Sequence, residues 1–169
     1  MKEDKIFKRE LYLNKIRGFY HDSEMIKVIT GIRRCGKSFL LKSIIEELMD
    51  NGVKDENIIY IQLDSKKNKN IQTPEQLENL IDNQVQNNDF KYLFIDEVQN
   101  VEGFESVVEA YRLEGNFSIF ITGSNSYLLS RRTNNQTYWK KNWIWNIYTK
   151  LLWIWGDRSE ERRVGKECR

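Results

Sequence analysis

Eight consecutive residues of this chain have the types and spacing of a phosphate-binding loop. They read Gly31-Ile32-Arg33-Arg34-Cys35-Gly36-Lys37-Ser38 and fit the pattern G-x-x-x-x-G-K-[ST]. In such a loop, backbone N–H groups surround phosphate oxygens at the N-terminus of a helix. Lys37 is expected to reach the β- and γ-phosphates, and Ser38 to give its hydroxyl to Mg²⁺, which prefers oxygen ligands. Gly31 and Gly36 are expected where the backbone turns tightly or passes close to phosphate.

Two adjacent carboxylates could complete this site. Asp96 and Glu97 follow the apolar run 91–95, and the ligands of an open α/β sheet lie outside the carboxyl ends of its strands. Asp96 is expected to hold the Mg²⁺ shell. Glu97 is expected to orient the water that attacks the γ-phosphate, or to take a proton from it. The alternative is a solvated turn after a strand.

Alternating strands and helices are predicted to position these residues. A strand is expected at 26–30, where the apolar pair Val28-Ile29 precedes the loop, and a helix is expected from Lys37 to Asn51, stopped by Gly52. The other expected elements are a helix or helix-turn within residues 1–24, strands at 57–63, 91–95 and 117–122, and helices at 74–86 and 103–114. Strands that are apolar on both faces belong to parallel sheets covered by helices, so a parallel α/β fold is predicted.

A polar residue at the end of the run 117–122 could sense the γ-phosphate. The candidates are Thr122, Ser124 and Asn125. Their spacing does not distinguish them, and any of the three could instead cap a following helix. The single histidine, His21, has no metal-ligand companion nearby and is expected to be a solvated loop residue.

Composition and charge limit the class of protein. The 169 residues fit one domain, and 40% of them are apolar. The chain carries 27 Lys and Arg against 25 Asp and Glu. Because this excess lies after residue 130, the charge of residues 1–130 does not indicate a nucleic-acid partner. Residues 1–10 are charged and do not read as a signal peptide, and the two cysteines, Cys35 and Cys168, suit a reducing cytoplasm.

Three stretches together resemble the bacterial and archaeal AAA-superfamily ATPases that carry a second, uncharacterised C-terminal domain. They run from Thr30 to Ser38, from Phe94 to Gln99 and from Ile121 to Ser126, and the similarity covers roughly residues 5–130. The resemblance implies a three-layer P-loop NTPase whose parallel sheet has the order 5-1-4-3-2. It also implies ATP and Mg²⁺ as cofactors, bound at Walker A and Walker B motifs.

The same resemblance assigns roles to individual residues. Glu97 and Lys37 are implied as catalytic, and Ser38 and Asp96 as metal-binding. The residues expected to bind the nucleotide are Gly31, Ile32, Arg33, Arg34, Cys35, Gly36, Lys37, Ser38, Phe39, Thr122, Ser124 and Asn125. Whether the two loop arginines touch the nucleotide or a partner stays open.

The sequence departs from this family after Ser130. All five tryptophans lie in this part, and the last twelve residues resemble a translated sequencing adapter. A Trp- and Lys-rich run is typical of a segment at a membrane interface, but we expect a shifted reading frame and no membrane partner. Residues 1–130 are therefore predicted to form an incomplete ATPase domain and 131–169 no domain. The fifth strand would then be missing, which would place the run 26–30 at a sheet edge.

Three functions remain open from the sequence. The first is ATP binding, with hydrolysis in a complete parent protein that acts on a protein partner or self-assembles through the missing C-terminal region. The second is a nucleotide-dependent switch or scaffold with little turnover. The third is a small-molecule kinase, which the direct succession of Asp96 and Glu97 and the lack of an obvious acceptor-site lid disfavour.

Overall fold

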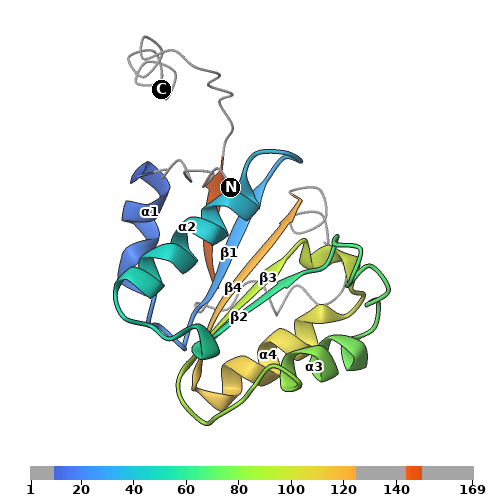
Figure 1. Ribbon diagram of the computed structural model, residues 1–169. Coiled ribbons are helices and arrows are strands. Elements are labelled where there is room, and N and C mark those ends of the chain that lie inside the picture. The colour runs from blue at the N-terminus through green and yellow to red at the C-terminus, as the bar shows by residue number, and fades with distance from the viewer. Residues whose placement is uncertain (1–9, 125–143, 150–169) are drawn as a thin grey trace, which may run out of the picture.

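The strands lie side by side in one parallel sheet. The computed structural model describes residues 10–124 and 144–149. The strand order is β2-β3-β4-β1-β5 (Figure 1), and each pairing is parallel. The strands are β1 (Ile26–Gly31), β2 (Ile58–Gln62), β3 (Lys91–Asp96), β4 (Phe117–Ser124) and β5 (Ile144–Thr149). The predicted parallel sheet and its order 5-1-4-3-2 are confirmed.

The position beside β1 is occupied, which corrects one expectation. β5 pairs with β1 along its length, from Ile26 opposite Ile144 to Gly31 opposite Thr149. The fifth strand is therefore present, and β1 lies between β4 and β5 rather than at a sheet edge. The β5 segment contains Ile, Trp, Tyr and Thr, which favour extended structure, although its sequence departs from the family pattern. Other residues of the tail lie outside the described ranges.

Helices cover both faces of the sheet, so the fold has three layers (Figure 1). α1 and α2 pack against one face, and α3 and α4 pack against the other. The helices are α1 (Glu10–Ile16), α2 (Lys37–Asp50), α3 (Pro74–Asp82) and α4 (Phe104–Glu114), with short 3-10 turns η1 (Arg17–Phe19), η2 (Asp55–Asn57) and η3 (Val98–Asn100).

Each face of the sheet has its own apolar core. Successive side chains of a strand point to opposite faces, so in β1 Val28 packs on the α3 and α4 side and Ile29 on the α1 and α2 side. The first core includes Leu77, Leu93, Ile95, Phe104 and Ile121. The second includes Leu13, Leu40, Ile44, Phe94 and Phe120. Both cores hold the strand ends that carry the candidate site.

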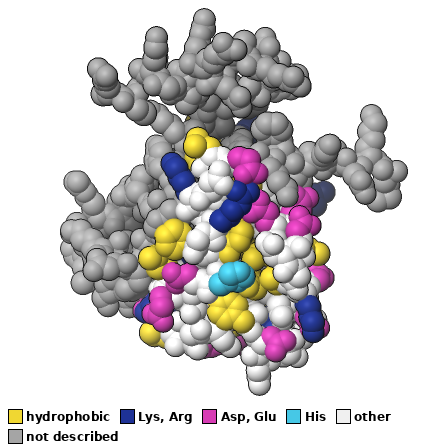
Figure 2. All heavy atoms as spheres, turned by 90° about the vertical axis from the view of Figure 1, so that its left-hand side faces the viewer, with side chains coloured by type: hydrophobic (Ala, Val, Ile, Leu, Met, Phe, Trp, Pro, Cys, Tyr) yellow, Lys and Arg dark blue, Asp and Glu magenta, His cyan; other side chains and the backbone are white. Residues whose placement is uncertain are grey.

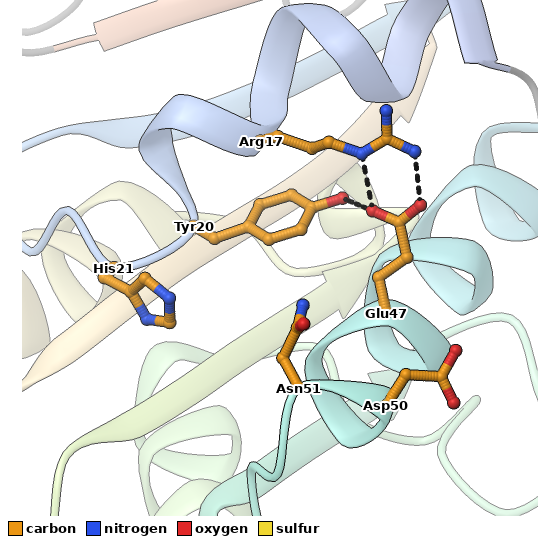
Figure 3. A pocket seen from close by; sticks show the side chains of 6 residues that line it. All are labelled: Arg17, Tyr20, His21, Glu47, Asp50 and Asn51. Atoms are coloured by element: carbon orange, nitrogen blue, oxygen red, sulfur yellow. Dashed lines mark hydrogen bonds and ion pairs between the residues drawn. The ribbon is translucent and has the colours of Figure 1, made fainter.

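A buried carboxylate joins the N-terminal segment to α2. Glu47, near the end of α2, accepts hydrogen bonds from Arg17 Nε at 3.0 Å, from Arg17 Nη2 at 2.6 Å and from Tyr20 Oη at 2.8 Å (Figure 3). Such charge-assisted hydrogen bonds offset the loss of water around a buried charge. They fix α2 at the end opposite to the phosphate loop.

An open cavity of about 370 Å³ lies beside this cluster. It is lined by Arg17, Tyr20, His21, Glu47, Asp50 and Asn51 (Figure 3). The exposure of His21 agrees with the sequence prediction, but its Nδ1 also lies 2.6 Å from Tyr92 Oη. His21 therefore joins the segment before β1 to β3, a contact that its neighbours in the sequence do not indicate.

A completely buried lysine anchors the start of β1. Lys27 Nζ donates to the Met25 carbonyl at 3.0 Å, to Ser118 Oγ at 2.8 Å and to the Asp22 carbonyl. Ser118 in turn donates to the Tyr20 carbonyl at 2.7 Å. Burial lowers the pKa of Lys27 to about 8, although the charge of Asp22 opposes this shift.

We expect Lys27 to make stability rise with pH. The pKa of Lys27 is about 8 in the fold and about 10.5 in the unfolded chain, so the unfolded state binds more protons between these values. The free energy of unfolding of the wild type, relative to Lys27→Met, should increase by about 2 kcal/mol from pH 7 to pH 10. Urea unfolding of both proteins at each pH measures the difference. Parallel pH profiles would contradict it.

Candidate functional site

The phosphate loop connects the carboxyl end of β1 to the first turn of α2. Gly31 ends β1 and Lys37 begins α2. Gly36 has φ 81° and Arg34 has φ 65°, both in the left-handed region that favours glycine. Gly31, the other predicted glycine, has no positive φ, so the tight turn lies in the second half of the loop. The first N–H groups of a helix have no intrahelical partner. Those at the start of α2 can therefore donate to an anion.

The loop side chains divide into buried and exposed ones. Ile32 is 58% exposed and Phe39 is 59% exposed, and both loop arginines, Arg33 and Arg34, are exposed as well. Cys35 is completely buried, as fits a small residue under the loop. The loop surface thus offers two guanidinium groups and two apolar side chains, a combination that suits a ligand with a phosphate chain and an apolar ring.

Lys37 brings the two predicted motifs together. Its side chain is 3% exposed, and its Nζ lies 3.3 Å from Glu97 Oε1. The same Nζ lies 3.5 Å from the carbonyl oxygens of Gly31 and Ile32. The phosphate loop follows the carboxyl end of β1, and the acidic pair lies at the carboxyl end of β3. The two motifs therefore meet where the parallel strands end.

Asp96 is a completely buried carboxylate with two hydroxyl donors. Thr122 Oγ1 donates to its Oδ1 at 2.5 Å, and Tyr60 Oη donates to its Oδ2 at 3.3 Å. Burial, together with the Asp96 charge, raises the pKa of Tyr60, so this hydroxyl stays protonated. Within residues 10–124, no lysine, arginine or histidine forms an ion pair with Asp96.

The surroundings of Asp96 fit Mg²⁺. Each carboxylate oxygen keeps a lone pair after accepting one hydroxyl, and such hydrogen bonds orient a metal-binding carboxylate. Ser38, in the first turn of α2, supplies a hydroxyl oxygen at the same sheet edge. Among the described residues, no three His, Cys, Asp or Glu side chains could hold a metal by themselves. A cation here would need phosphate or water oxygens as well, which is usual for Mg²⁺.

Thr122 links both acidic residues. Glu97 has φ 58° and ψ 49°, a left-handed conformation that costs a non-glycine residue roughly 1 kcal/mol. Its N–H donates to Thr122 Oγ1 at 3.0 Å, while the same hydroxyl donates to Asp96. One buried threonine on β4 therefore holds the end of β3 in a conformation that a strand would not adopt by itself.

The three candidate phosphate sensors differ in their positions. The hydroxyl of Thr122 is committed to Asp96 and Glu97, which favours a positioning role. Ser124 is partly exposed and lies opposite Gly31 in the register of β4 with β1, beside the start of the phosphate loop. Asn125 lies outside the described residues.

Two polar residues of the site were not predicted from the sequence. Tyr60 reaches Asp96 from the neighbouring strand β2. Gln99 Nε2, from η3, donates to Glu97 Oε2 at 2.5 Å. The position of Gln99, two residues after Glu97, is a signal in the sequence that these side chains could meet. The contact of Tyr60 with Asp96 has no such signal, because it depends on the register of β2 with β3.

The molecular surface gives little further guidance. On the face that Figure 2 presents, basic and acidic side chains are mixed rather than gathered into one patch. In the part of the chain that the structure describes, every helix is too short or too polar to cross a membrane.

A protein family and two curated relatives match this chain. A family model described as an AAA domain matches residues 23–144. An uncharacterised protein of Haemophilus influenzae is 39% identical over 123 residues, which cover 72% of this chain and 30% of the relative. An uncharacterised protein of Methanocaldococcus jannaschii is 35% identical over 130 residues, which cover 77% of this chain and 26% of the relative. The chain spans less than a third of the length of these curated relatives.

Two solved structures share the fold. Cdc6p from Pyrobaculum aerophilum has a TM-score of 0.56 at 12% identity, covering 86% of this chain and 47% of its own. The ORC2 protein of Aeropyrum pernix, solved as ADPNP and ADP complexes, has a TM-score of 0.52 at 15% identity, covering 82% of this chain and 45% of its own. At such low identity the likeness concerns the fold alone.

We expect Thr122→Val to destabilise the fold. The substitution keeps the shape of the side chain but removes the acceptor of the Glu97 N–H and the donor to Asp96. Buried polar groups left without partners cost about 1–3 kcal/mol, so the free energy of unfolding should fall by that amount. Thr122→Ser, which retains the hydroxyl, is the matched control. Equal stability of the Val and Ser variants in urea would refute the bridging role.

Proposed function

The chain belongs to the AAA domain family, and from this premise we propose that it binds ATP with Mg²⁺ and that the complete protein hydrolyses the ATP. The observation that carries the proposal is the 3.3 Å contact between Lys37 and Glu97. It supports a single site in which a phosphate-binding lysine faces a carboxylate able to act on water. Binding and turnover in this chain are open to direct measurement.

The phosphate loop and the acidic residues have different roles in this proposal. Lys37 and the N–H groups at the start of α2 bind the β- and γ-phosphates. Ser38 and Asp96 hold the cation, which when bound neutralises charge on the phosphate oxygens. Exposed Ile32 and Phe39 offer apolar contacts to the nucleoside. We therefore propose the same residues, 31–39, for nucleotide binding as the sequence predicted.

The Lys37–Glu97 ion pair has to open for hydrolysis. The Lys37 ammonium group moves away from the Glu97 carboxylate and contacts the phosphates instead. This movement frees Glu97 Oε1 to act on water. The water oxygen attacks the γ-phosphorus while the bond to the β–γ bridging oxygen breaks, and the water proton passes to Glu97. The bridging oxygen leaves with its electron pair as part of ADP.

A switch with little turnover is the second candidate. It is favoured by the fact that both oxygens of Glu97 are engaged, one by Lys37 and one by Gln99, since such a carboxylate is a poor base until it is released. In either case, coupling to a protein partner or to self-assembly is proposed to reside in regions that the longer relatives possess. A small-molecule kinase finds no specific support among these contacts.

Lys37→Ala should abolish Mg-ATP binding. The substitution removes the buried cation that reaches the phosphates, while the loop backbone is left intact. Isothermal titration calorimetry should show heat of binding for the wild type and none for the variant. Lys54→Ala is the matched control, because Lys54 is exposed and outside the site. Unchanged affinity in Lys37→Ala would disprove the assignment of the phosphate loop.

Glu97→Gln should retain bound ATP but slow its hydrolysis. Loss of a general base lowers the rate by a factor on the order of 10² to 10⁴. Asp96→Asn should instead lower the affinity for Mg²⁺ and so raise the Mg²⁺ concentration needed for the reaction. Single-turnover phosphate release, with protein in excess over ATP, measures both effects. Glu102→Gln, an exposed acid of the same segment, is the control. Equal rates for wild type and Glu97→Gln would remove Glu97 from the mechanism and favour the switch.

A further inference from the structure

Gln99 is fixed beside the candidate site by the turn that follows β3. Val98 and Val101 are completely buried in the core under α3 and α4. The Asn100 N–H donates to the Glu97 carbonyl at 3.1 Å, and the Val101 N–H donates to the Val98 carbonyl at 3.2 Å. The two valines therefore hold η3 on the core side, and the Gln99 side chain returns to the carboxylate two residues before it.

The orientation of the Gln99 amide follows from its partner. Its Nε2 donates to Glu97 Oε2 at 2.5 Å. The opposite orientation would place the amide oxygen against a carboxylate oxygen, where neither atom can donate. Oε1 therefore faces away from the carboxylate. It is buried, and it has no hydrogen-bond partner among the residues that the structure describes.

An unpaired buried carbonyl calls for an explanation. A carbonyl oxygen that loses water without gaining a donor reduces stability. An apolar side chain of similar length, such as methionine, would avoid this cost. The hydrogen bond from Nε2 to Glu97 accounts for a polar side chain at this position. It does not account for an Oε1 that is buried without a donor, which a ligand that donates a hydrogen bond would supply.

We propose that Gln99 orients the attacking water together with Glu97, an inference that rests on the hydrolysis proposed above. The amide Nε2 holds the carboxylate, and the amide Oε1 accepts a hydrogen bond from the water. One water proton then passes to Glu97 as the oxygen attacks the γ-phosphorus, while the other hydrogen stays on the oxygen and bonds to Gln99. Two acceptors fix both O–H directions of the water, and its lone pair then points at phosphorus.

The test compares Gln99→Met with Gln99→Glu. Gln99→Met removes both polar atoms at similar length, and single-turnover phosphate release should fall roughly 10- to 100-fold. The affinity for Mg-ATP should stay within twofold. The midpoint of urea unfolding should change little, because the loss of the donor to Glu97 is offset by the removal of an unpaired buried oxygen. Gln99→Glu keeps acceptor oxygens, and it keeps a donor to Glu97 only where the two carboxylates share one proton. It should therefore retain part of the rate and recover more of it as the pH falls. Gln86→Met, at an exposed glutamine in the segment between α3 and β3, is the control.

A second measurement separates this inference from the proposed function. Mg-ADP with aluminium fluoride imitates the transferred phosphoryl group with a water in line. Wild type should bind this complex more tightly than Mg-ADP alone, and Gln99→Met should lose that difference. If wild type shows no difference, the hydrolysis proposal fails, and with it the role of Gln99. If wild type shows it and Gln99→Met keeps it, or if Gln99→Met loses stability and nucleotide affinity together, Gln99 does not orient the water.

Discussion

A carboxylate that is completely removed from water must be hydrogen-bonded or bound to a cation, and Asp96 imposes this requirement on the fold. Its two donors come from the strands on either side of β3: Tyr60 from β2 and Thr122 from β4. The order β2-β3-β4 is therefore also the arrangement that keeps the charge of Asp96 satisfied. The same threonine accepts the Glu97 N–H, so the conformation of the next acid depends on this strand order as well.

α2 carries the other half of the site, and it is held at both ends. Lys37 in its first turn contacts Glu97, while Glu47 near its last turn contacts Arg17 and Tyr20. Between these ends the helix packs on Ile29 and Phe120 through its buried leucine and isoleucine side chains. The N-terminal segment thus supports the site at a distance, by fixing the helix from which the lysine projects.

Local patterns in the sequence predicted the phosphate loop, the acidic pair and the strand order, because each depends on a short run of residues or on a resemblance carried by such runs. They did not predict which polar residue at the end of β4 is committed to the acids. That depends on the parallel register of β3 with β4, which no spacing along the chain reveals. Tyr60 and the buried Lys27 were missed for the same reason. β5 was not predicted because the sequence after Ser130 departs from the family pattern, although the residues of β5 favour extended structure.

The contact between Lys37 and Glu97 also bears on how an anion would arrive. Two opposite charges 3.3 Å apart largely cancel when viewed from several ångströms away, so this pair contributes little long-range attraction. The exposed guanidinium groups of Arg33 and Arg34 have no such neighbour in the ion pairs of the described residues. Encounter with a polyanion would therefore depend on the arginines and would be sensitive to ionic strength. Its residence time would depend on the buried lysine, so different cations of the same loop would set the two kinetic constants of one binding event.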